Sequence, residues 1–185
     1  PIVLFTGQLF TDAVWQPLLD AWVGREVIVA DNRSDDTIGG FAQRLLDDAP
    51  PRFVLIAHAM GGFVAFEVMC RAPGRVAKLA LISTLASADG PAQTARRQGY
   101  IDLVTSGQFD QVVEERIPIL FPEEKRNDAR LLGIARQMAA DTGAETFLAQ
   151  QRAIMARIDS RPRLGGIAVP TMLIWGEQGG ITSRA

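Results

Sequence analysis

The chain has 185 residues, of which 48% are hydrophobic, and its formal net charge is −2. This length and composition suit one domain with a sizeable core. The nearly balanced charge excludes the strongly basic proteins that bind nucleic acid or an anionic membrane surface, and no apolar stretch approaches the ~20 residues of a membrane span. No basic leader precedes the first apolar run, so we expect a cytoplasmic protein.

Five short apolar runs predict the strands of a central sheet. They lie at about residues 2–6, 26–30, 53–57, 79–83 and 171–175. Each run is apolar at successive positions, which is typical of strands that are buried on both faces of a parallel sheet. We expect the third run at the centre of the sheet, between the first and the fourth.

Amphipathic stretches connect the first four runs. Their apolar side chains recur at helical spacing over about residues 12–23, 38–49 and 60–72. Strands that alternate with helices predict an α/β fold, in which a mostly parallel central sheet carries helices on both faces.

The alternation stops between the fourth and fifth runs. This region shows helical patterns and no convincing strand, with breaks at Gly107, Pro118, Pro122 and Gly143. We therefore predict a core formed by residues 1–90 and 161–185, with residues 91–160 inserted as a helical cap. Such a cap would cover the carboxyl ends of the strands, where open α/β sheets bind ligands, and its apolar content predicts a mainly apolar pocket.

A strand-to-helix turn lies at Ala57-His58-Ala59-Met60-Gly61-Gly62. Small residues are needed at such a turn because the strand and helix backbones nearly touch. The pattern predicts a strained backbone at the apex, Ala59, whose side chain projects above the sheet.

This turn and its surroundings resemble the α/β-hydrolase fold, in which the turn typically reads G-H-S-M-G-G. Thr6-Gly7-Gln8-Leu9 is similar to the turn that forms half of the family's oxyanion hole, and residues 170–178 resemble the strand that leads to the catalytic acid. The resemblance implies a small esterase-like or lactonase-like hydrolase with a helical cap. It implies no cofactor and no metal site, and the sequence contains no phosphate-binding or dinucleotide-binding motif.

The chain departs from the family pattern at its catalytic positions. Ala59 stands at the nucleophile position, where a methyl group cannot form an acyl-enzyme. Gly179 stands at the acid position, beside Glu177, and neither Ser83-Thr84 nor Asp89 is a convincing substitute. The sole histidine, His58, precedes the apex, so we expect it to have a structural role.

The last predicted strand, residues 171–175, would leave a long apolar edge at Ala185, whereas the family places another strand and the catalytic histidine after it. A fragment, an incompletely described protein or a homo-oligomer that buries the edge would each account for this.

The backbone N–H groups of Gln8 and Met60 should still form an oxyanion hole, because they need no particular side chain. We expect a pocket floor of Gln8, Leu9, Ala59 and Met60 that binds a small apolar carbonyl compound, with negligible ester hydrolysis. A serine ester hydrolase in an inactivated form and a natural pseudoenzyme or receptor both fit this pattern. A non-covalent enzyme and a purely structural module remain further alternatives.

Overall fold

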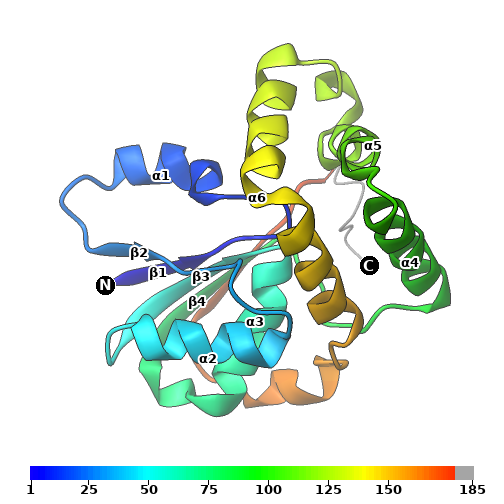
Figure 1. The fold of residues 1–185 in the computed structure, drawn as a ribbon. Helices are drawn as coiled ribbons and strands as arrows, with labels where there is room; N and C mark the ends of the chain where they lie inside the picture. The colour runs from blue at the N-terminus through cyan, green and yellow to red at the C-terminus, as the bar shows by residue number, and fades with distance from the viewer. Residues whose placement is uncertain (178–185) are drawn as a thin grey trace.

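The computed structural model describes residues 1–177 and contains one sheet of five parallel strands (Figure 1). The strands are β1 (Ile2–Phe5), β2 (Val27–Val29), β3 (Phe53–His58), β4 (Val76–Ile82) and β5 (Thr171–Ile174). Their order is β2-β1-β3-β4-β5. The prediction that the third strand lies centrally, between the first and the fourth, is therefore confirmed.

Three helices connect the first four strands, as predicted. They are α1 (Gln16–Ala21), α2 (Ile38–Asp48) and α3 (Met60–Arg71). Helices α2 and α3 lie side by side on one face of the sheet, and α1 lies on the opposite side (Figure 1). Short 3-10 turns occur at Asp12–Trp15, Pro73–Arg75, Pro118–Leu120, Glu123–Lys125 and Arg161–Gly166.

The main core lies between the sheet and helices α2 and α3. Its fully buried members include Phe5, Phe41, Phe53, Leu55, Val64 and Leu79. Burial of the strands is less symmetrical than their sequences predict. Along β3, alternate residues are fully buried, while those between them are only half-buried. At the edge, Met172 and Leu173 of β5 are 61% and 60% exposed, because the described residues cover neither face of this strand.

Three further helices lie over the carboxyl ends of the strands (Figure 1). They are α4 (Pro91–Thr105), α5 (Phe109–Arg116) and α6 (Ala129–Met155). Helix α6 bends at Gly143, whose φ of 76° and ψ of 166° are not helical, so the predicted break is present. A second apolar cluster joins these helices to the loop after β1 and includes Leu9, Val112, Ile117, Met138 and Phe147.

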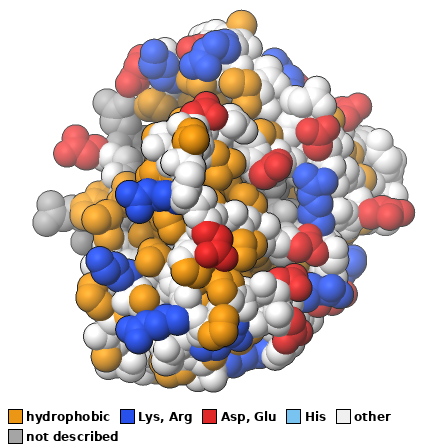
Figure 2. Space-filling model, turned by 90° about the vertical axis from the view of Figure 1, so that its left-hand side faces the viewer, with side chains coloured by type: hydrophobic (Ala, Val, Ile, Leu, Met, Phe, Trp, Pro, Cys, Tyr) orange, Lys and Arg blue, Asp and Glu red, His pale blue; other side chains and the backbone are white. Residues whose placement is uncertain are grey.

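The molecular surface mixes both signs of charge. On the face in Figure 2, acidic and basic side chains are interspersed with apolar groups, without a broad field of one sign. In the part of the chain that the structure describes, no helix has the length and apolar character that crossing a membrane requires.

Candidate functional site

The turn between β3 and α3 has the geometry expected of a strained elbow. Ala59 adopts φ 51° and ψ −113°, a region that residues with a side chain rarely occupy. A Cβ atom added to Gly61 would overlap the carbonyl oxygen of Phe5, and one added to Gly7 would lie 2.9 Å from the Cβ atom of Ala59. The small residues therefore let three backbone segments meet, and the predicted strain at Ala59 is confirmed.

Hydrogen bonds from the neighbouring strand hold this elbow in place. The Ala59 N–H donates to the carbonyl oxygen of Ile82 at 2.9 Å, and the Thr84 hydroxyl donates to the Ala59 carbonyl oxygen at 2.7 Å. Thr84 also occupies the space that a side chain at Gly62 would need. The end of β4 thus fixes both sides of the apex.

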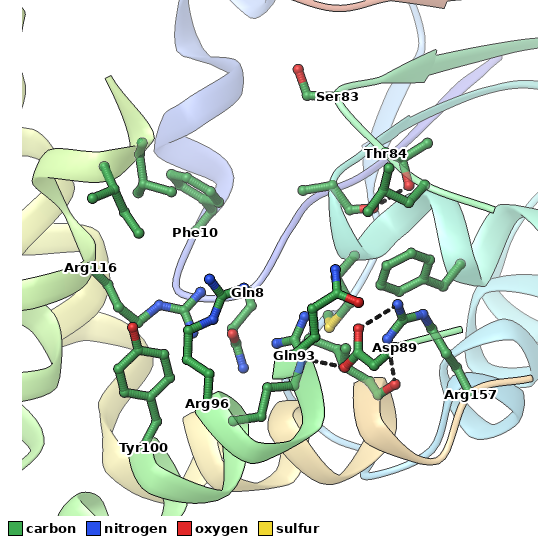
Figure 3. Close-up of a pocket in the computed structure, with 18 residues that line it drawn as sticks. Gln8, Phe10, Ser83, Thr84, Asp89, Gln93, Arg96, Tyr100, Arg116 and Arg157 are labelled. Atoms are coloured by element: carbon green, nitrogen blue, oxygen red, sulfur yellow. Dashed lines mark hydrogen bonds and ion pairs between the residues drawn. The ribbon is translucent and has the colours of Figure 1, made fainter. Parts of the chain in front are cut away.

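A cavity of about 360 Å³ lies between the elbow and the cap helices (Figure 3). Three of the four expected floor residues line it: Gln8, Ala59 and Met60. The fourth, Leu9, does not. It is buried in the second apolar cluster, and its N–H donates to Gln150 Oε1 at 3.3 Å. Its positive φ of 64° belongs to the turn that directs the chain under the cap.

The cavity lining is apolar over the larger part of its area, as expected, but it also includes charged side chains that were not expected. Its apolar lining includes Phe10, Met60, Phe63, Leu85, Leu120 and Ile154. One face of α4 contributes polar side chains at helical spacing, namely Gln93, Arg96, Arg97 and Tyr100, and two further arginines are Arg116 and Arg157. None of these arginines was predicted, although the helical spacing of Arg96 and Arg97 with Gln93 and Tyr100 is visible in the sequence.

Asp89 is the acidic residue in the cavity wall, and it forms ion pairs with two of the arginines. Its carboxylate accepts from Arg97 Nε at 2.6 Å and from Arg157 Nη2 at 2.7 Å. Burial raises the pKa of Asp89, but hydrogen bonds and charge from Arg157 and Arg97 outweigh this and hold the pKa below its usual value. The Arg157 guanidinium also lies 4.3 Å from the Phe63 ring centroid. This arrangement is structural, which agrees with the low expectation for Asp89 as a catalytic acid.

His58 is buried and is not part of the cavity lining. Its ring packs against Phe10 and Trp15, at centroid distances of 5.1 and 6.2 Å. Within the described residues its Nδ1 has no hydrogen-bond partner. Burial lowers the pKa of His58 to about 4, so the ring is neutral at neutral pH. These contacts support the structural role expected from the sequence.

The buried, neutral His58 makes stability depend on pH. Because the pKa is about 4 in the folded protein and 6.5 in the unfolded chain, the unfolded chain binds the proton first as the pH falls. We expect the free energy of unfolding to be insensitive to this group above pH 6.5 and to fall by up to about 3 kcal/mol between pH 6.5 and 4.

Urea titrations across this pH range measure the effect, with the His58→Gln variant as the comparison. The variant should lack this part of the pH dependence, whatever its absolute stability. An equally steep fall in the variant would contradict the assignment to His58.

The other expected site elements are backbone donors and the acid loop. Within residues 1–177, neither the Gln8 N–H nor the Met60 N–H donates a hydrogen bond to the protein, so both are free for a ligand. The Gln8 Oε1 atom is also buried without a donor.

In the acid loop, Glu177 is exposed, and Gly179 lies outside the described residues. Across residues 1–177, no group of three or more potential metal-binding side chains occurs.

Comparison with known families gives a match along nearly the whole chain. The profile of the Alpha/beta hydrolase family matches residues 5–184. The "Putative carbamate hydrolase RutD" of Azorhizobium caulinodans is 31% identical over 190 residues, which cover 94% of this chain and 71% of that protein. The pimeloyl-[acyl-carrier protein] methyl ester esterase of Klebsiella pneumoniae is 28% identical over 154 residues, covering 80% of this chain and 60% of that protein.

Solved structures share the fold at lower sequence identity. A malate-bound thermophilic esterase from Thermogutta terrifontis superposes with a TM-score of 0.84 at 24% identity, covering 99% of this chain and 73% of that one. A hydrolase from Pseudomonas aeruginosa gives a TM-score of 0.86 at 22% identity, covering 100% of this chain and 74% of that one.

Proposed function

Because the chain belongs to the Alpha/beta hydrolase family, we propose that its cavity binds a small carboxylic ester or lactone and does not hydrolyse it through a covalent intermediate. The observation that carries the proposal is the methyl group of Ala59, which lines the cavity at the apex of the strained elbow. The ligand carbonyl would lie at this apex, where a hydrolase of this family places its nucleophile.

Two features support binding of a carbonyl group. The free N–H groups of Gln8 and Met60 belong to residues that line the cavity together with Ala59. Backbone donors of this kind stabilise a carbonyl oxygen that carries negative charge, and the start of α3 at Met60 adds the positive end of a helix dipole.

Two features argue against covalent turnover. A methyl group has no electron pair with which to attack a carbonyl carbon. The histidine that the sequence contains packs against Phe10 and Trp15 and does not line the cavity, so it cannot take a proton from a nucleophile there.

An assay with p-nitrophenyl butyrate tests the proposal. We expect no burst of p-nitrophenolate and no acyl adduct in the intact-protein mass spectrum. Any steady release should not exceed the ~10³-fold acceleration over water that an oxyanion hole supplies on its own. A stoichiometric burst, or a protein mass raised by one butyryl group, would overturn the proposal.

A second candidate is a hydrolase whose nucleophile has been replaced, and the strained backbone of Ala59 favours it. An Ala59→Ser variant separates the two candidates, with Ala92→Ser on the exposed surface of α4 as the control that adds a hydroxyl elsewhere. Turnover gained by Ala59→Ser and not by Ala92→Ser would establish that the chain is a hydrolase whose nucleophile has been replaced. Because His58 does not reach position 59, free imidazole is added to both assays as a base. Ester binding without turnover in both variants under these conditions would support a binding protein.

A further inference from the structure

The arginines of the cavity are not all neutralised. Asp89 pairs with Arg97 and Arg157, whose side chains are 17% and 4% exposed. Arg96 and Arg116 have no carboxylate within ion-pair distance among residues 1–177. Two guanidinium groups therefore lie in the cavity wall without a counter-charge from the described part of the protein.

Arg116 is held in a specific position despite lacking an acidic partner. Its guanidinium lies 5.2 Å from the Tyr100 ring centroid and 5.5 Å from that of Phe147. Stacking of this kind orients the planar group and leaves its N–H donors free at the edge. Figure 3 shows Arg116 and Arg96 directed toward the part of the cavity where Gln8 lies.

The surroundings of Arg116 disfavour its positive charge. Burial lowers the pKa of Arg116 to about 10, and the neighbouring charges of Arg97 and Arg96 act in the same direction. The group remains protonated at neutral pH. A half-buried cation beside two others is unfavourable unless an anion approaches it, so a negatively charged ligand would bind here with little further reorganisation of the site.

We propose that Arg96 and Arg116 form a subsite for a carboxylate, and that the ligand is a small ester or lactone carrying a free carboxylate at its other end. This inference rests on the proposed function, because it places the ester end at Ala59 in the same cavity. A carboxylate is planar and accepts paired N–H donors from guanidinium groups, and the cavity of about 360 Å³ admits a short chain between the two ends.

Calorimetric titration of the unmodified chain with monomethyl adipate tests the subsite. Dimethyl adipate, which has the ester but no charge, should bind at least tenfold more weakly, and added salt should weaken the monoester selectively. Arg96→Gln and Arg116→Gln should each weaken monoester binding about tenfold or more and leave dimethyl adipate unchanged. Arg130→Gln, an exposed arginine on α6, is the matched control and should change neither.

Folding of the variants is checked by thermal unfolding without ligand. If Arg116→Gln does not fold, Arg116→Lys keeps a positive charge but loses the planar, stacked donors. It should bind the monoester less tightly than the unmodified chain and more tightly than dimethyl adipate.

The remaining outcomes separate this inference from the proposed function. Octanoate matches monomethyl adipate in chain length but has no ester. If octanoate binds as tightly and depends equally on Arg96 and Arg116, the carboxylate subsite stands and ester binding at Ala59 fails. If dimethyl adipate binds as tightly as the monoester, the subsite is wrong and the proposed function stands. Equal displacement of the monoester by butyl phosphate and octanoate would overturn the assignment to carboxylate, because the site would then select charge alone.

Discussion

Replacing Gly61 with alanine should destabilise the protein by about 3 kcal/mol, because the added Cβ atom would overlap the carbonyl oxygen of Phe5. That oxygen belongs to β1, next to the central strand, so neither backbone can move without disturbing the sheet. The displacement would also move the elbow, and ester binding should weaken together with stability.

Urea unfolding at 25 °C measures the effect of Gly61→Ala. Gly133→Ala in α6 is the matched control, since no atom lies within 4 Å of its added Cβ atom. The control should be neutral or stabilise by up to ~1 kcal/mol, as expected inside a helix. If both variants unfold at the same urea concentration, the close contact at the elbow is not what requires glycine.

Replacing Asp89 with asparagine should lower the free energy of unfolding by about 3–5 kcal/mol, because it leaves Arg97 and Arg157 in the cavity wall without their carboxylate. The side chain keeps its shape, so the loss comes from charge rather than packing. Glu114→Gln is a suitable control. It breaks the exposed pair with Arg136, and water screening should leave its unfolding midpoint nearly unchanged.

Acid unfolding provides a second measurement for Asp89. The pKa of Asp89 in the folded protein is below the usual value of 3.8. Its contribution to the free energy of unfolding is therefore fully present above pH 3.8 and is lost as the pH falls through the lower pKa of the folded protein. The Asp89→Asn variant should lack this part of the acid transition. A variant as stable as the parent protein at neutral pH would show that the two arginines do not need the carboxylate.

The parts of the fold that depend on local patterns could be predicted from the sequence. The five apolar runs predicted the strands, with the third between the first and the fourth, and the small residues around Ala59 predicted the strained elbow. These predictions succeed because consecutive residues carry the signal: two-sided apolar runs for buried strands, and glycines where backbones touch.

The features that depend on distant residues could not be predicted. Arg116 reaches the cavity only because α5 packs beside α4, and nothing near it in the sequence indicates that it lacks an acidic partner. Leu9 was expected in the cavity floor beside Gln8. Its backbone has a positive φ, and its side chain packs in the second apolar cluster instead. The exposure of β5, in contrast, agrees with the long apolar edge expected at residues 171–175.

The most direct test of ester binding without hydrolysis follows the carbonyl group itself, by ¹³C nuclear magnetic resonance of monomethyl adipate labelled at the ester carbonyl. We expect the bound signal to remain that of an intact trigonal ester, shifted from its position in water by the backbone N–H donors of Gln8 and Met60. The ester should persist without release of methanol. A tetrahedral or acyl-enzyme signal, or conversion to adipate and methanol faster than in a protein-free control, would contradict it.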